Sequence, residues 1–220
     1  MNLATSVTMV RIVLLPLILF FWIAAIEFIY ISPFFSYWGR LIAIIFYMIA
    51  VATDVFDGQI ARKRNEVTDF GKVIDQIADK MLVLLGFLLI ITDPILLDSP
   101  IMVMPVWFAV LVVFINIGRD YVVGIVRQIS KEIIPADRFG KMKTMFQFGS
   151  IWLFMLWAVS AALNWSLYSI DILNTLHIYF AWVTMIVATA LSVLSGVNYV
   201  LGYRQAKRAS EPKVEEKPVE

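Results

Sequence analysis

The feature of this sequence that most restricts its fold is a series of six long apolar stretches. Each holds on the order of 20 residues, the length that an α-helix needs to cross a bilayer. They cover about 7–30, 38–61, 69–92, 101–118 with a charged extension to 130, 140–163 and 175–203. Because these runs do not alternate between apolar and polar residues, transmembrane strands are disfavoured. We therefore predict an all-α integral membrane protein with six transmembrane helices.

The composition excludes several other classes of protein. Hydrophobic residues make up 61% of the chain and charged residues 16%, against about 45–50% and about 25% in soluble proteins. A single soluble core of this size could not bury so much apolar surface. Cysteine is absent, which excludes disulfides and thiolate chemistry, and a net charge of +1 gives no reason to expect a nucleic-acid partner.

The chain is expected to divide into a membrane domain, residues 1–204, and a disordered charged tail, residues 205–220. The tail is rich in Lys, Glu, Pro and Ser and has almost nothing to bury. Lys and Arg gather after the second and fourth stretches and in the tail, whereas residues 93–100 and 164–174 contain neither. By the positive-inside rule we expect both termini to be cytoplasmic. The basic residues behind this expectation are Arg62, Lys63, Arg64, Lys72, Arg127, Lys131, Arg138, Lys141, Arg204, Lys207 and Arg208.

Four aspartates mark the cytoplasmic halves of the second and third stretches. Asp54 and Asp57 are three residues apart, and Asp75 and Asp79 are four apart, so each pair shares one face of a helix. Small residues lie on the same two faces: Gly58, Ala61, Gly71 and Ala78. Carboxylates inside a membrane are costly and rarely face lipid. If the two helices are antiparallel neighbours, the four carboxylates converge on one space.

Four converging carboxylates repel one another unless cations neutralise them. Their hard oxygen ligands suit Mg²⁺ or Mn²⁺, and four suffice for two metal ions, an arrangement used in phosphoryl transfer. Arg62 follows directly and could pair with a phosphate. A cap at the start of a helix explains Asp69 better than a metal role does. A cation transporter or channel is the alternative from another class, with the acidic cluster as its ion path.

The motif D-x-x-D-G-x-x-A-R, followed after eight residues by G-x-x-x-D-x-x-x-D, resembles the signature of the CDP-alcohol phosphotransferase family at all eight positions. The resemblance implies six membrane helices, a homodimer, and two divalent metal ions over the diphosphate of a CDP-linked donor. By the same resemblance Asp79 is a metal ligand and the general base. The metal ligands it implies are Asp54, Asp57, Asp75 and Asp79, and the donor-binding residues are Asp57, Gly58, Ala61, Arg62 and Gly71.

Within the family, the chain is most similar to bacterial members that transfer a phosphatidyl group from CDP-diacylglycerol to glycerol-3-phosphate, releasing CMP. Later basic motifs carry this likeness, at Gly118-Arg119, Arg127 and 140–144, together with the opening segment 8–11. Gln76 and the pair Asp120-Tyr121 depart from that group, which usually has Pro and Glu-Ile there. The resemblance implies a bacterial inner (plasma) membrane. Inositol phosphate, serine or phosphatidylglycerol stay open as other acceptors.

A phosphate-bearing acceptor needs cations near the inner membrane edge. Arg119, Arg127 and Lys141 can supply them, with Lys143 as a weaker candidate. Lys141 and Lys143 point about 200° apart on a helix, so we expect only one of them to face the site and the other to meet lipid headgroups. The part played by Lys80, beside Asp79, stays open between pairing with that carboxylate and tuning it. The polar site as a whole is predicted at the cytoplasmic ends of helices two to five.

Overall fold

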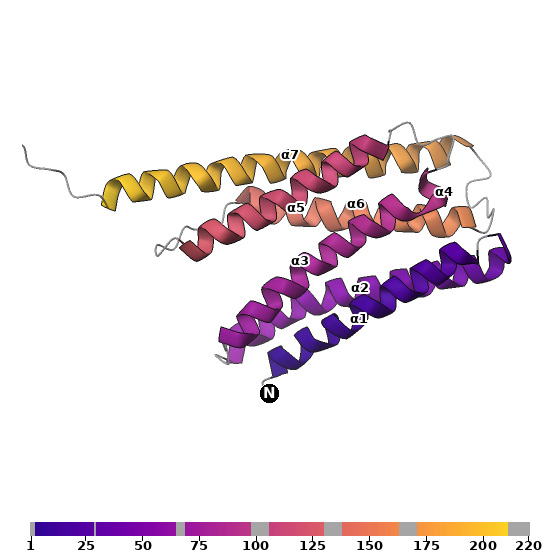
Figure 1. Ribbon diagram of the computed structural model, residues 1–220, viewed down its shortest axis with the longest axis horizontal. Helices are drawn as coiled ribbons and strands as arrows, with labels where there is room; N and C mark the ends of the chain where they lie inside the picture. Colours follow the sequence, from indigo (N-terminus) through magenta and orange to yellow (C-terminus); the bar gives the residue numbers. More distant parts are fainter. Residues whose placement is uncertain are drawn as a thin grey trace, which may run out of the picture.

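The computed structural model is a bundle of long α-helices (Figure 1). It describes residues 3–28, 30–64, 69–97, 106–129, 138–162 and 171–210, and for residues 54–64, 127–129 and 206–210, among others, only the backbone. Within these residues the elements are α1 (Leu3–Glu27), α2 (Pro33–Arg64), α3 (Asp69–Thr92), α4 (Pro94–Leu97), α5 (Val106–Ile129), α6 (Arg138–Ala162) and α7 (Asp171–Ser210). The all-α prediction is therefore confirmed for the described part of the chain.

Five of these helices are long and apolar enough to cross a membrane. The candidate spans are Thr8–Glu27, Pro33–Thr53, Val106–Val126, Phe139–Ala162 and Thr175–Gln205. The helix α3 is not among them, because every 18-residue stretch of it contains Asp75, Asp79 and Lys80. The charged residues that are candidates for the site are therefore also the ones that keep α3 out of the candidate spans. The chain is a multi-pass membrane protein.

The C-terminal boundary of the helical region lies later than the sequence predicted. Residues 205–210, placed in a disordered tail, continue α7 as far as Ser210. No Pro or Gly interrupts this stretch, and Gln, Ala, Lys and Arg all favour helix. Residues 211–220, the rest of the predicted tail, lie outside the described residues.

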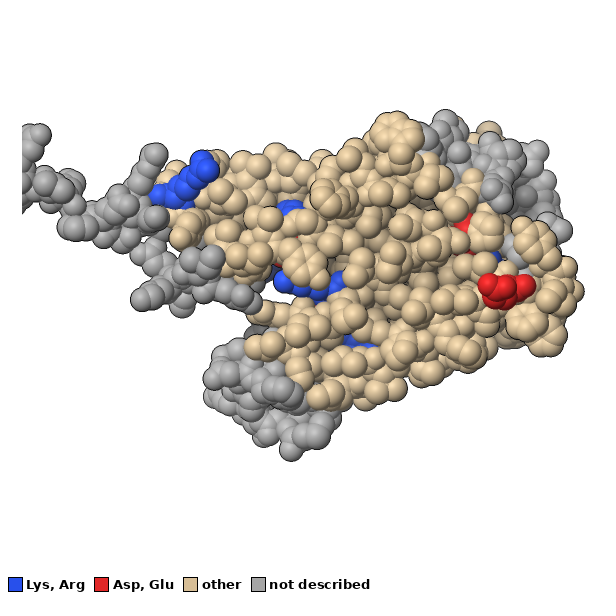
Figure 2. Space-filling model, in the orientation of Figure 1, with Lys and Arg blue, Asp and Glu red and all other residues tan. Residues whose placement is uncertain are grey.

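The helices form two groups that meet along α3 and between α2 and α6. The helix α1 packs on α2, α6 packs on α7, and α5 also packs on α7. The helix α3 crosses between the groups and contacts α1, α5 and α6 (Figure 1). Toward the end that carries the N-terminus the two groups separate, and Figure 2 shows a hollow there with Lys and Arg side chains inside it. The opposite end of the bundle is closed.

The closed half is held by close helix contacts. A Cβ atom at Gly86 would lie 2.6 Å from the Tyr47 hydroxyl and 2.8 Å from Ile151 Cγ2, so only a glycine lets α2, α3 and α6 approach this closely. Phe154 and Trp182 join α6 to α7, with ring centroids 5.0 Å apart in an edge-to-face arrangement. This tight packing provides a rigid base for the open half.

A fully buried ion pair fixes the closed end. Arg40 on α2 and Asp93, just after α3, are both 0% exposed. Arg40 Nε donates to Asp93 Oδ2 at 2.8 Å and its Nη2 donates to Oδ1 at 3.0 Å. Asp93 Oδ1 also accepts from the N–H of Ile95 in α4, at 2.9 Å. Arg40 is therefore the partner of a buried carboxylate.

Candidate active site

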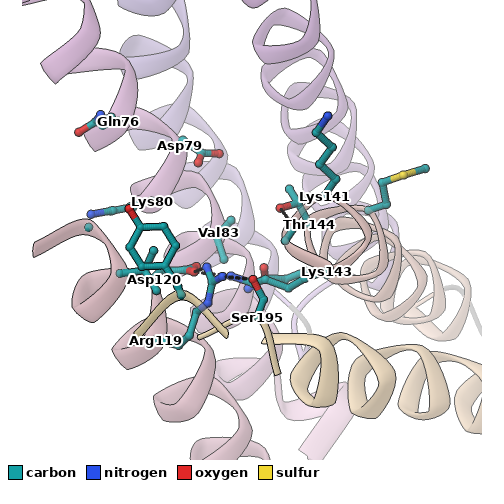
Figure 3. Close-up of a pocket in the computed structure, with 16 residues that line it drawn as sticks. Gln76, Asp79, Lys80, Val83, Arg119, Asp120, Lys141, Lys143, Thr144 and Ser195 are labelled. Carbon is teal, nitrogen blue, oxygen red and sulfur yellow. Dashed lines mark hydrogen bonds and ion pairs between the residues drawn. The ribbon is translucent and has the colours of Figure 1, made fainter. Parts of the chain in front are cut away.

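A cavity of about 690 Å³ lies in the open half, between α3, α5, α6 and α7 (Figure 3). This volume is in the range of small-molecule binding sites, about 300–1,000 Å³. Its charged lining is mainly basic: Lys80, Arg119, Lys141 and Lys143, against the two carboxylates Asp79 and Asp120. Such a space favours an anionic ligand.

Arg119 and Lys143 meet on one carboxylate at the base of the cavity. Asp120 Oδ1 accepts from Arg119 Nη1 at 2.9 Å and from the ammonium of Lys143. Arg119 Nη2 donates to Ser195 Oγ, on α7, at 2.5 Å. Figure 3 shows these four side chains gathered from α5, α6 and α7. The sequence contained no signal for Ser195, and it marked Asp120 only as a departure from the family pattern.

The placement of the two lysines on α6 differs from the expectation. Both line the cavity, but Lys143 is the buried one, with a side chain 4% exposed and paired with Asp120, whereas Lys141 is exposed. The expectation that only one of the two lysines faces the site, with Lys143 as the weaker candidate, is therefore wrong. Lysines on two different faces of α6 can both line the cavity, because a long lysine side chain can bend toward a carboxylate on the neighbouring helix.

Lys80 is directed at α5. Its Nζ lies 5.0 Å from the centroid of the Tyr121 ring, a cation–π contact. A Cβ atom at Gly124 would be 2.7 Å from the same Nζ, so the glycine makes room for the ammonium. Tyr121, the other departure from the family pattern, thereby acquires a structural role.

The acidic side of the site lies on α3. Asp79 lines the cavity, and Asp75 lies one turn before it with its side chain 49% exposed. Arg11 Nη1, from α1, donates to Asp75 Oδ1 at 3.3 Å, and the Arg11 side chain is 0% exposed. Arg11 lies in the opening segment 8–11 but is not among the predicted site residues, although an arginine inside an apolar helix is itself a signal of function.

The structure describes the side chains of two of the four predicted aspartate ligands, Asp75 and Asp79. Among the described residues, no three acidic, histidine or cysteine side chains gather so as to hold a metal ion. Asp75 and Asp79 supply hard oxygen atoms from α3. Gly71 lies in the first turn of α3. The backbone of α2 is helical as far as Arg64, but the side chains of several predicted site residues lie outside the described ones: Asp54, Asp57, Gly58, Ala61, Arg62 and Arg127.

A family model described as CDP-alcohol phosphatidyltransferase matches residues 1–194. The chain belongs to this family. The resemblance inferred from the eight-position motif is therefore confirmed. The matched region contains α1 to α6 and the first part of α7, and it ends just before Ser195 and Tyr199, the two α7 residues that line the cavity.

Curated relatives of this phosphatidyltransferase family extend over most of the chain. A protein of Yersinia enterocolitica is 30% identical over 156 residues, 69% of this chain and 75% of its own. One from Bacillus subtilis is 29% identical over 213 residues, 90% of this chain and 93% of its own. One from Rickettsia typhi is 25% identical over 201 residues, with 90% and 94% covered. All three are named CDP-diacylglycerol–glycerol-3-phosphate 3-phosphatidyltransferase.

Proposed function

We propose that the protein transfers a phosphatidyl group from CDP-diacylglycerol to the hydroxyl of glycerol-3-phosphate, giving phosphatidylglycerolphosphate and CMP. The observation that carries this proposal is the basic cavity beside Asp79, in a chain that belongs to the CDP-alcohol phosphatidyltransferase family. The shared name of its relatives points to the same donor and acceptor.

The acceptor's phosphate is assigned to the basic wall of the cavity. Arg119 presents a guanidinium that can bind a phosphate in a bidentate manner, and Lys143 and Lys141 add point charges. Arg127 is assigned to the same wall by sequence. An acceptor without a phosphate, such as serine, would not use this basic wall in the same way.

The donor's diphosphate is assigned to the acidic side, between α2 and α3. The family generally depends on divalent metal ions. Two Mg²⁺ or Mn²⁺ ions, held by Asp54, Asp57, Asp75 and Asp79, would supply positive charge to the diphosphate of the donor and would stabilise the charge that develops on CMP as it leaves. Arg11 orients Asp75 through its 3.3 Å hydrogen bond. The donor itself is assigned to Asp57, Gly58, Ala61, Arg62 and Gly71.

In the reaction, the acceptor oxygen forms a bond to the β-phosphorus of CDP-diacylglycerol. The bond between that phosphorus and the bridging oxygen breaks, and CMP leaves with the electron pair. Asp79 takes the proton of the acceptor hydroxyl. It suits the role of general base because it lines the cavity, between the basic wall and Asp75.

The membrane arrangement follows from the same assignment. We propose six spans, with both termini on the cytoplasmic side of a bacterial inner membrane. The helix α3 is the sixth span, because Asp79 and Lys80 line the cavity and Asp75 pairs with Arg11 of α1. The site then lies at the inner membrane edge. The lipid tails of the donor stay in the bilayer while nucleotide and acceptor arrive from water. A homodimer is proposed from the family resemblance.

The cavity's charge argues against a cation transporter. Four basic side chains face two carboxylates within it, so a cation would meet net repulsion there. Inositol phosphate remains the strongest alternative acceptor, since it offers the same phosphate chemistry.

The test is release of CMP by the purified protein with CDP-diacylglycerol, with and without Mg²⁺, across glycerol-3-phosphate, inositol phosphate, serine and phosphatidylglycerol. We expect Mg²⁺-dependent release with glycerol-3-phosphate, reduced at least about 100-fold in Asp57→Asn, because a neutral amide binds Mg²⁺ far less well than a carboxylate. Asp69→Asn, which changes a predicted cap, is the matched control and should retain activity. Preference for another acceptor would overturn the glycerol-3-phosphate assignment alone.

A further inference from the structure

We infer that Asp120 and Ser195 are positioning residues that hold Arg119 and Lys143 together as one preformed binding unit for the acceptor's phosphate. This inference rests on the proposed function, since it concerns how the basic wall of that site is kept in place. Neither residue belongs to the family's eight-position motif, and they come from different helices, α5 and α7.

Asp120 joins the two cations through a single atom. Its Oδ1 accepts from Arg119 Nη1 at 2.9 Å and from Lys143 Nζ. Lys143 is 4% exposed and Arg119 is 17% exposed, so water can replace little of what the carboxylate provides. Without this carboxylate, two like charges would face each other across a poorly hydrated space and would move apart.

Ser195 holds the other end of the guanidinium. Arg119 Nη2 donates to Ser195 Oγ at 2.5 Å while Nη1 is held by Asp120, so the two terminal nitrogens are anchored to α7 and α5. Two glycines leave space for this arrangement. A Cβ atom at Gly196 would lie 3.0 Å from Arg119 Cγ, and one at Gly140 would lie 3.3 Å from Ser195 Oγ. The plane of the guanidinium is thereby fixed before a ligand arrives.

The charge balance leaves the unit attractive to an anion. Asp120 is one carboxylate shared by two cations, so the trio retains one net positive charge, and exposed Lys141 adds another at the same cavity. A phosphate monoester carries close to two negative charges at neutral pH. Preorganised donors cost little reorganisation when the ligand binds. Asp120 therefore orients Arg119 and Lys143 without cancelling the positive charge that attracts the acceptor's phosphate.

The test compares Asp120→Asn, Asp120→Glu and Ser195→Ala with a matched control, Ser192→Ala. Ser192 lies on the same helix, and its buried hydroxyl has no hydrogen-bond partner within the described part of the chain. Steady-state CMP release is measured with glycerol-3-phosphate and CDP-diacylglycerol varied separately, and thermal unfolding is followed in detergent. We expect Asp120→Asn to lower kcat/KM for glycerol-3-phosphate by about 10-fold or more, mainly through KM. Donor KM should stay unchanged, and Asp120→Glu should recover part of the loss.

Ser195→Ala should lower the same kcat/KM by roughly 3- to 10-fold, and Ser192→Ala should match the wild type. The inference is overturned if Asp120→Asn leaves acceptor kcat/KM unchanged or raises it, because the carboxylate would then only offset charge. It is equally overturned if Ser195→Ala behaves like Ser192→Ala, or if acceptor and donor parameters fall together with the unfolding temperature. A wild-type protein that does not use glycerol-3-phosphate would instead refute the proposed function.

Discussion

Substituting each of the two lysines at the start of α6 in turn tests which of them binds the acceptor. The sequence and the tertiary structure give different answers. From the sequence, Lys143 is the weaker candidate of the two, whereas the structure places Lys143 in the buried network and Lys141 at the exposed mouth of the cavity. We predict that Lys143→Met weakens use of glycerol-3-phosphate more than Lys141→Met does. Methionine keeps most of the apolar stem and removes the charge, so packing is disturbed little in either variant.

The magnitudes follow from exposure. A hydrogen bond to a charged group in a poorly hydrated place contributes about 1.5–3 kcal/mol, so Lys143→Met should lower kcat/KM for the acceptor by about 10- to 150-fold. An exposed charge about 4 Å from its partner in water contributes about 1 kcal/mol, so Lys141→Met should cost about fivefold. Salt screens exposed charges most, and the effect of Lys141→Met should therefore shrink in high salt while that of Lys143→Met persists.

The assay is CMP release with glycerol-3-phosphate varied at saturating CDP-diacylglycerol, repeated at low and high ionic strength. Donor KM is the internal control, because neither lysine is assigned to the nucleotide. An equal or larger loss in Lys141→Met would refute the reasoning, and so would a Lys143→Met effect that disappears in high salt.

Three further outcomes are expected. Gly58→Leu should raise KM for CDP-diacylglycerol at least about 10-fold, because the bulk of leucine would fill the proposed donor face; an unchanged donor KM in a folded protein would contradict that face. A membrane-impermeant thiol reagent on intact cells should label Cys at Ser99 and spare Cys at Ser210, and the reverse pattern would invert the proposed orientation. Asp93→Asn should lower the free energy of unfolding in detergent by about 3–5 kcal/mol, because it leaves the buried Arg40 guanidinium without its charged partner; a variant as stable as the wild type would show that the pair is dispensable.

Helix type and approximate position could be predicted from the sequence because both depend on local properties. A run of about 20 apolar residues is a helix in a bilayer wherever it packs, and α1, α2, α3, α5, α6 and α7 each overlap most of one of the six predicted stretches. The end of α7 differs from the prediction, because residues 205–210 are polar and yet favour helix. The family was likewise recognisable from eight positions at fixed spacing, which form a local pattern.

The sequence by itself therefore determined a helical membrane protein, its family and the acidic motif, which all follow from residue type and short-range spacing. Only the tertiary structure decided which cation is buried, that Ser195 holds Arg119, and that Arg11 reaches Asp75 across 64 positions. These contacts depend on how α1, α5, α6 and α7 cross α3, and helical periodicity says nothing about the angle or depth of such crossings. A side chain's partner on another helix is set by that packing, which no single helix encodes.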